Sequence, residues 1–343
     1  MRRFLAWAVS FFVFLVIGAA PAMACGGLIG RNGAVNLVRT TTLAGYHNGV
    51  EHYVTSFSFA GGGGKFGSIV PLPGVPTKVE RGGDWTLQRL ARETQPPREA
   101  AFDSVRGAAF IAAARVLLTA RIDALDLTVL EGGGRSVGSW AKSNGFLLPP
   151  DAPEVLDFYA ARSPIFLAAK FDGDAAAARG QALGDGTPVH LTIPTKNPWV
   201  PLRILGLGKV STDHVNADVY LLTDEAPDLL PHAGHGFTVP LSEPASATLI
   251  TDLAADKGMS WIPNSGMWLS YLKIDSTVGQ LRYDLAINAH GGAASPRDAG
   301  LSKVSAIVES SDRGMIPAAA TLLLLVLVTW RAGRRQVLRN ADA

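Results

Sequence analysis

The stretch that decides the fold class runs from residue 47 to residue 59 as HNGVEHYVTSFSF. From Val50 onward, aromatic and β-branched side chains alternate with polar ones, which is the period of a β-strand. The Asn48-Gly49 pair precedes this run, and these two residue types tolerate the positive φ angles of a tight hairpin turn. Residues 34–43, rich in Val, Thr and Leu, supply the other strand. The sequence therefore predicts an antiparallel hairpin.

Similar patterns predict further short strands and fewer helices. The strands are expected at 66–70, 116–129, 165–171, 188–193, 199–205, 217–222, 237–241, 268–274 and 281–287. A change of phase near Asp123 indicates a β-bulge inside the second of these. Helices are expected to follow Asp84, to surround Trp140, and to begin at Asp151 and Ser246. The predicted fold class is α+β, mostly antiparallel sheet with several short helices.

The N-terminus has the features of a signal peptide. Arg2 and Arg3 precede an apolar run over residues 4–20, and Ala22-Met23-Ala24 has the small-x-small pattern of a cleavage site. The alternative is a retained N-terminal membrane helix. Cleavage after Ala24 would make Cys25 the first residue of the mature chain. Cys25 would then carry either a free amine or a lipid, although Ala22 and Met23 depart from the usual lipoprotein pattern.

The C-terminus is expected to anchor the chain in a membrane. Residues 315–330 are almost wholly apolar, close to the ~17–25 residues that span a bilayer core. Four arginines follow within residues 331–339, so the positive-inside rule puts the tail in the cytoplasm and the domain outside. The alternative for residues 315–330 is a buried core helix. The expected localisation is the cell membrane, with a single pass.

These ends divide the chain into a signal peptide (1–24), an extracytoplasmic domain (25–302), a juxtamembrane segment (303–314), a transmembrane helix (315–330) and a cytoplasmic tail (331–343). Residues 172–186, rich in Asp, Ala and Gly, are the candidate boundary if the domain has two parts. Residues 289–302, rich in Gly and small side chains, are expected to tether the domain to the membrane.

Charge and cysteine content exclude some classes of protein. The whole chain has a formal charge of +2, but the basic residues of the two ends account for this excess, and the domain alone carries about −3. This charge gives no electrostatic reason to expect nucleic-acid binding. Cys25 is the only cysteine, so the domain cannot contain an internal disulfide. The expected partners are the lipid bilayer, through the C-terminal helix, and an envelope protein or surface polymer.

Few motifs suggest chemistry. The run Gly61-Gly62-Gly63-Gly64-Lys65 lacks the Ser or Thr that a phosphate-binding loop needs after its lysine, since Phe66 follows. His232 and His235 form an H-x-x-H pair, the weak candidates for metal ligands, but a zinc site needs at least three protein ligands. The sequence predicts no catalytic residue, no cofactor and no established metal site.

Two pairs of carboxylates, Asp123 with Asp126 and Asp224 with Glu225, are more typical of solvated turns than of general acid–base catalysis. Two functions remain open. One is a non-enzymatic binding module of the envelope. The other is a membrane-anchored hydrolase whose site assembles only on folding, with His232, His235 or His290 as base or ligand.

Several strings occur in the order found in one bacterial family. They are Ala24-Cys25-Gly26-Gly27, residues 67–73 (GSIVPLP), 126–130 (DLTVL), Trp140, 144–146 (NGF), 155–159 (VLDFY), 166–170 (FLAAK) and 219–223 (VYLLT). Together they resemble the family called domain of unknown function 2330, over roughly Cys25 to Leu285. The resemblance implies an exported bacterial protein, often membrane-anchored, and no known activity. The Ala-rich residues 100–114 depart from the family pattern.

Overall fold

The computed structural model describes residues 27–29, 37–59, 61–62, 66–94, 104–105, 115–172, 175, 178, 187–290 and 292–301. These residues, apart from Leu301, belong to one compact unit that ends at Gly300. The predicted signal segment, the cleavage site at Ala24 and Cys25, and the predicted transmembrane segment 315–330 lie outside the described residues. None of the described helices combines the length and the apolar character that crossing a bilayer requires.

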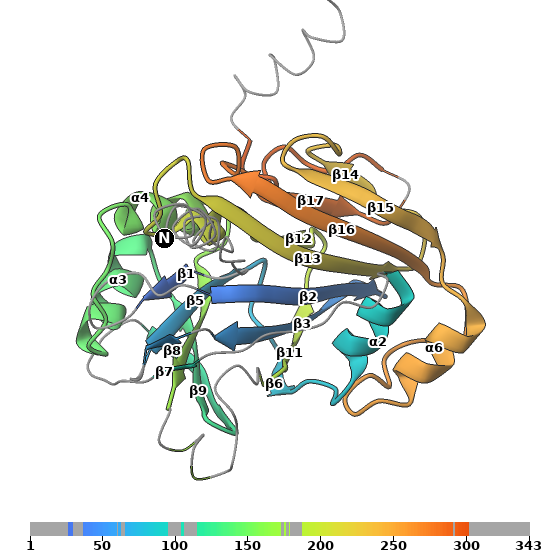
Figure 1. Cartoon of the computed structure of the whole chain (residues 1–343), viewed down its shortest axis with the longest axis horizontal. Helices are drawn as coiled ribbons and strands as arrows, with labels where there is room; N and C mark the ends of the chain where they lie inside the picture. The colour runs from blue at the N-terminus through green and yellow to red at the C-terminus, as the bar shows by residue number, and fades with distance from the viewer. Residues whose placement is uncertain are drawn as a thin grey trace, which may run out of the picture. The chain divides into compact units, whose positions relative to one another are not determined.

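The largest sheet has seven strands in the order β15-β16-β13-β2-β3-β11-β6 (Figure 1). Its neighbouring strands are antiparallel except for β13 and β2, which run parallel. The strands are β15 (Phe237–Pro244), β16 (Trp268–Thr277), β13 (His214–Thr223), β2 (Leu37–His47), β3 (Val50–Phe59), β11 (Val189–Pro194) and β6 (Lys78–Arg81).

The predicted hairpin is the pair β2 and β3 at the centre of this sheet. His47 pairs with Val50, and the turn residues Asn48 and Gly49 have φ angles of 51° and 78°. These values are those of the mirror-image turn that matches the twist of the strands. The hairpin prediction is therefore confirmed.

A second sheet has five antiparallel strands in the order β1-β5-β10-β9-β8. Asp123, with a φ of 53°, and Ala124 form the turn between β8 and β9. The predicted bulge near Asp123 was therefore wrong, because a two-residue turn changes the phase of the pattern just as a bulge does. The strands are β1 (Gly27–Ile29), β5 (Phe66–Leu72), β10 (Ile165–Phe171), β9 (Leu125–Glu131) and β8 (Arg115–Ile122).

The remaining described strands form two smaller sheets. One has the order β12-β17-β14, with β12 at Trp199–Val200, β17 at Leu285–Asn288 and β14 at Asp228–Leu230. The other pairs β4 (Gly61–Gly62) with β7 (Ser104–Val105). The described residues thus form an α+β fold in which antiparallel pairing dominates, as predicted.

The strands in the predicted ranges 199–205 and 281–287 are shorter than expected, and the buried side chain of Asp284 accounts for the end of the first. The Asp284 carboxylate accepts hydrogen bonds from the backbone N–H groups of Leu202 and Arg203, at 2.7 and 3.0 Å. The chain therefore turns into the 3₁₀ helix η1 (Arg203–Gly206) after β12. Asp284 also binds Arg162 and the Tyr159 hydroxyl, so it joins these loops to helix α4 (Ala152–Ala160).

The residues expected to tether the domain instead pack against it. Ala299 is fully buried, and its carbonyl accepts a hydrogen bond of 2.9 Å from the backbone N–H of Asp284. Ala294 is also buried, and its backbone N–H donates to Asp228. The compact unit therefore extends to Gly300.

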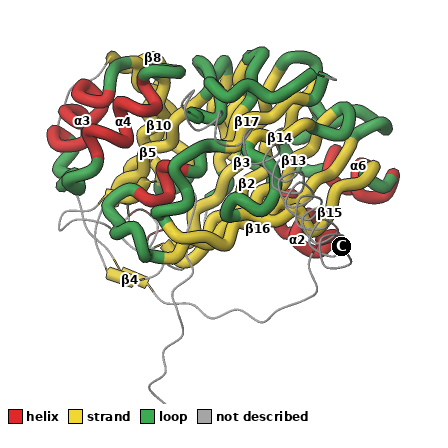
Figure 2. The backbone as a smooth tube through the Cα atoms, turned by 90° about the horizontal axis from the view of Figure 1, so that it is seen from above, coloured by secondary structure: helices red, strands yellow, loops and turns green. Residues whose placement is uncertain are grey.

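The α-helices with described bounds are α2, α3, α4 and α6, and they lie in two pairs (Figures 1 and 2). Helix α3 (Gly134–Ser143) packs against α4 (Ala152–Ala160) beside the five-stranded sheet, and both were predicted. Helix α2 (Thr86–Thr94) packs against α6 (Ala247–Ala254). Ser246 caps α6 through the backbone N–H of Leu249, and Gly258 follows with a φ of 80°.

Helices α2 and α6 cover one face of the seven-stranded sheet. The apolar side chains of both helices meet those of the strands in a single buried cluster, to which the loop before β16 also contributes. This burial is the main source of stability for this part of the fold. The cluster contains Leu43, Val54, Leu87, Leu90, Tyr220, Leu222, Leu249, Ile250, Leu253, Met259, Ile262, Met267, Leu269 and Tyr271.

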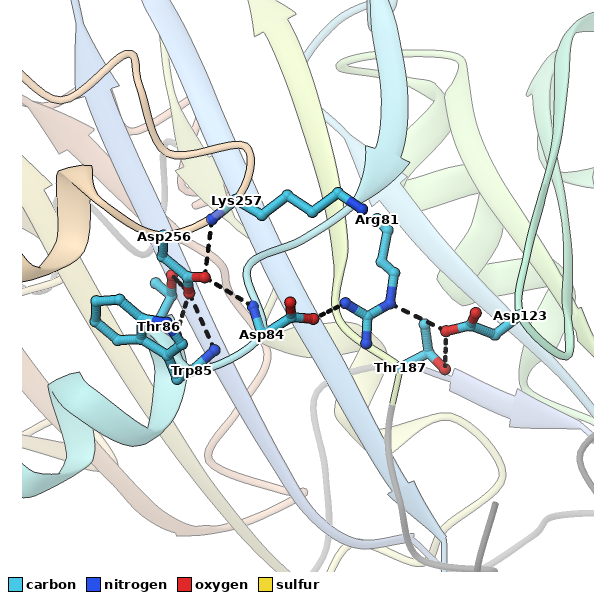
Figure 3. A network of polar contacts seen from close by, with 8 residues as sticks. All are labelled: Arg81, Asp84, Trp85, Thr86, Asp123, Thr187, Asp256 and Lys257. Carbon is cyan, nitrogen blue, oxygen red and sulfur yellow. Dashed lines mark hydrogen bonds and ion pairs between the residues drawn. The ribbon is translucent and has the colours of Figure 1, made fainter. Parts of the chain in front are cut away.

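The N-terminus of α2 is capped by a residue from a distant part of the chain (Figure 3). The Asp256 carboxylate accepts hydrogen bonds from the backbone N–H groups of Asp84, Trp85 and Thr86, at 2.8 to 3.0 Å. It also accepts one from the Thr86 hydroxyl at 2.7 Å. The predicted cap, Asp84, instead pairs its side chain with Arg81. A carboxylate at this position satisfies free amides and complements the helix dipole.

Candidate functional site

The histidines named as weak metal candidates lie on one exposed loop. His232 and His235 follow β14, and Nδ1 of His235 is 2.9 Å from the His232 carbonyl oxygen. No group of three or more His, Cys, Asp or Glu residues among the described residues is arranged to hold a metal ion. His290 lies elsewhere, after β17, with its Nε2 atom 3.2 Å from the Tyr46 hydroxyl.

The first pair of carboxylates has one member in the turn between β8 and β9 and the other in β9. Asp123 accepts a hydrogen bond of 3.1 Å from Nε of Arg81, and the Thr187 hydroxyl lies 3.3 Å away (Figure 3). Asp126 pairs with Arg121 at 2.7 Å. Each carboxylate therefore has its own cation.

The second pair is also divided. Asp224 contacts Nδ1 of His47 at 2.5 Å, and the amide nitrogen of Asn48 lies 2.8 Å from the other ring nitrogen of His47. Glu225 contributes a backbone carbonyl that accepts a hydrogen bond of 2.7 Å from the Thr223 hydroxyl. Both nitrogens of the His47 ring are thus engaged, and the contact ties the β2–β3 turn to the end of β13.

The structure instead gathers titratable residues on the β2–β3 hairpin, where the sequence predicted no site. Glu51 has no solvent exposure, and neither of its carboxyl oxygens has a hydrogen-bond partner of ordinary geometry among the described residues. Burial raises the pKa of Glu51 to about 8, against a smaller lowering by the backbone N–H of Trp199. A buried carboxyl without a partner favours its neutral form because the charged form has lost its hydration.

Tyr46 lies directly across from Glu51 in the register of the two strands. Its hydroxyl donates a hydrogen bond of 2.9 Å to the carbonyl of Thr195, which leaves the oxygen free to accept from Nε2 of His290. The rings of Tyr46 and His290 meet edge to face, with centroids 5.2 Å apart. Burial raises the pKa of Tyr46, and the negative charges of Glu51 and Asp224 raise it further.

The next residue of β3, His52, takes part in a buried group of rings. Nδ1 of His52 lies 3.1 Å from Nε2 of His190, and the His52 ring stacks on Trp261 with centroids 4.1 Å apart. Burial, with smaller effects of His190 and His47, lowers the pKa of His52 to about 3. The low pKa favours a neutral imidazole.

His190 is the second histidine of this group. Its Nδ1 atom lies 3.5 Å from a carboxyl oxygen of Glu80 on the neighbouring strand β6. Burial lowers the pKa of His190 to about 4, and the opposing effect of Glu80 does not cancel the effect of burial. A neutral pair of imidazoles can share one hydrogen bond, with one ring as donor and the other as acceptor.

One feature of the sequence signals this hairpin site. Glu51 and His52 stand side by side in a run that is otherwise typical of a strand core. Strict alternation places Glu51 on the same face as Tyr53 and His52 on the polar face, whereas the structure covers both faces of β3. The partners His190, Trp261 and His290 come from distant segments, so spacing along the chain could not have identified them.

Comparison with solved structures gives matches of low similarity to structures of baculovirus P35. The crystal structure of baculovirus P35 matches with a TM-score of 0.38 and 9% identity, covering 74% of this chain and 97% of that chain. The complex of caspase-8 with P35 matches with a TM-score of 0.36 and 8% identity, covering 73% and 96%. Likeness at this level does not establish a common fold. No curated protein matches the sequence.

A family model matches residues 19–227, which include all the strings that suggested a family. The match begins within the predicted signal segment and ends before β14, short of the expected limit at Leu285. It covers more than half of the chain, and it confirms the resemblance drawn from the sequence. The chain therefore belongs to the family of uncharacterized proteins conserved in bacteria known as domain of unknown function 2330.

Proposed function

We propose that this chain is a binding module of the bacterial cell envelope, exported and then held at the membrane by a single C-terminal helix. The sequence of its two ends supports export and anchoring: an apolar segment before Ala24, and an apolar segment before the arginines of residues 331–339. Membership in a bacterial family supports only the bacterial part of this proposal.

The non-enzymatic part of the proposal rests on the contacts that the histidine rings make inside the fold. His47 is held by Asp224 and Asn48, His52 by His190 and Trp261, and His290 by Tyr46. A general base must be free to accept a proton from a nucleophile or a water within hydrogen-bond reach. Side chains already engaged in contacts that join strands and loops serve the fold, so these imidazoles favour binding over catalysis. The exposed His232 and His235 require a separate test.

Trp85 is the residue that we propose as a first contact for a partner. Its side chain is 38% exposed, while its backbone N–H is fixed by Asp256 at 3.0 Å (Figure 3). Tryptophan is enriched among the residues that dominate protein interfaces, and a fixed backbone lowers the entropy lost on binding.

In-cell crosslinking of the tagged full chain, followed by identification of the crosslinked species, tests the proposal. We expect one recurrent envelope component that is recovered with the wild type and with Val210→Ala, an exposed apolar control, and is reduced with Trp85→Ala. The proposal is overturned if the purified chain binds no envelope component but hydrolyses a peptide, ester or glycan, and loses that activity on His232→Ala or His290→Ala.

Mass spectrometry of the mature N-terminus tests the export of the chain. We expect the mature chain to begin at Cys25, with a free amine. A diacylglyceryl group on Cys25 would identify the chain as a lipoprotein, and a start elsewhere would contradict both forms of processing.

A further inference from the structure

The buried carboxyl of Glu51 lies beneath a cover made of two segments. Trp199 of β12 brings its backbone N–H toward the carboxyl, and β12 is paired with β17. Beyond β17, His290 rests on Tyr46, the cross-strand neighbour of Glu51. We call residues 195–200 together with 285–290 the cover.

Three hydrogen bonds among the described residues join the cover to the β2–β3 hairpin. The Tyr46 hydroxyl donates to the Thr195 carbonyl at 2.9 Å, and the Thr195 N–H donates to the Gly49 carbonyl at 3.1 Å. The third joins Nε2 of His290 to the Tyr46 hydroxyl at 3.2 Å. The cover is also joined internally, because the Ile287 N–H donates to the Pro198 carbonyl. Its two segments can therefore move together.

The backbone N–H of Trp199 stabilises a carboxylate on Glu51 only in part, and no side chain nearby among the described residues supplies a compensating positive charge. The titratable groups nearby are Tyr46 from β2, Asp224 after β13 and His290 after β17. Asp224 is itself acidic and is hydrogen-bonded to His47. The other neighbouring elements, β11 and β12, bring the uncharged residues Ile193 and Trp199. An ionised Glu51 must therefore reach water, and an unpaired buried charge is the costly alternative.

We propose that the proton on Glu51 is a latch for this cover: the cover stays closed on the β2–β3 hairpin while Glu51 is protonated, and it lifts when the proton is lost. Lifting breaks these hydrogen bonds, each of modest net strength, and also exposes buried side chains of the cover such as Trp199 and Leu285. The hydration that the carboxylate regains offsets part of this cost, so the open form gains population when the proton is lost. The seven-stranded sheet, with its large buried cluster on the other face, remains folded. This device does not depend on the proposed binding function.

Hydrogen exchange followed by mass spectrometry, on the full chain at pH 6.5 and pH 9, tests the latch. After correction for the intrinsic exchange rate, we expect protection of the cover amides to fall about tenfold or more between pH 6.5 and pH 9. The open population rises about tenfold for each pH unit up to the raised pKa of Glu51, about 8, and levels off above it. Amides of β13 and β16 are expected to keep their protection. Glu51→Gln, a neutral side chain of the same shape, is expected to remove the change.

Glu154→Gln is the matched control, because the Glu154 side chain on α4 is 76% exposed. It should retain the pH response of the wild type. If Glu51→Gln does not fold, Glu51→Met supplies the same neutral comparison. The proposal is overturned if the wild-type cover keeps its protection at pH 9, if the neutral variant loses protection equally, or if all strands lose protection together.

Discussion

Glu51 and His52 are consecutive residues of β3 whose side chains are buried on opposite faces of the seven-stranded sheet. Successive side chains of a strand point to opposite faces, so one strand carries a proton-sensitive group into each of two packed layers. Burial acts on the two groups in opposite directions. It raises the pKa of the acid Glu51 and lowers the pKa of the base His52.

We predict that these groups give the domain a maximum of stability near pH 6.5. The folded pKa values of His52 and His190, about 3 and 4, lie below the ordinary value of 6.5, so their contribution is lost as the pH falls below 6.5. The folded pKa of Glu51, about 8, lies above its ordinary value of 4.5, so its contribution is lost as the pH rises from 4.5 to 8. Between pH 4.5 and 6.5 the stability that the two histidines restore as the pH rises exceeds the stability that Glu51 loses.

Urea denaturation at a series of pH values measures this profile. Glu51→Gln should flatten the alkaline side and leave the acid side unchanged. A stability that stays level from pH 5 to pH 9 in the wild type would show that these buried groups do not retain their shifted pKa values.

The cap of α2 is the subject of a second prediction. Asp256→Asn removes the charge that faces three backbone N–H groups, and it should lower the free energy of unfolding by about 2–3 kcal/mol, the range for charged hydrogen bonds and caps. Asp252→Asn is the control: its carboxylate is 41% exposed, so the ion pair with Arg89 should contribute about 1 kcal/mol or less. Equal losses in the two variants would contradict this role of Asp256.

Arg162 and Asp284 form a buried ion pair, with side-chain exposures of 7% and 0%. Arg162→Met should lower the free energy of unfolding by roughly 3–5 kcal/mol, because it leaves the Asp284 charge buried without its cation. Arg115→Met, which breaks a pair whose arginine is 74% exposed, should cost about 1 kcal/mol or less. Thermal or chemical denaturation of both variants makes the comparison.

Gly45 lies where any side chain would meet Trp261. A Cβ atom on Gly45 would stand 2.2 Å from the Trp261 ring, whereas one on Gly133 would have no neighbour within 4 Å. Gly45→Ala should therefore destabilise the domain by about 1–3 kcal/mol and disturb the stacking on His52, and Gly133→Ala should be nearly neutral. A loss of near-ultraviolet circular dichroism in Gly45→Ala alone would agree, and equal stability of both variants would not.

Local signals were sufficient for much of the fold. The Asn48-Gly49 turn, the strand at 165–171 and the helix capped by Ser246 were all predicted, because each depends on residues within a few positions of one another. The cap of α2 could not be predicted in this way. Asp256 lies 170 positions from Thr86, and folding alone brings them together.

The hairpin site shows the same limit more sharply. The alternation over 50–59 predicted that β3 is a strand but assigned His52 to a polar face, because a sequence pattern cannot report that two layers cover the sheet. The burial of Glu51 depends on Trp199 and on the loop that carries His290, which are distant in sequence. The expected site residues His232 and His235, by contrast, lie together on an exposed loop, as neighbours in sequence often do.

Placement of the domain outside the cytoplasm is the claim on which the proposed function rests, and protease treatment of spheroplasts tests it directly. With an epitope tag after Ala343, added protease should degrade the domain and leave the tag in a protected membrane-bound fragment. A protected domain in intact spheroplasts, degraded only after lysis, would contradict the proposed topology and the envelope function with it.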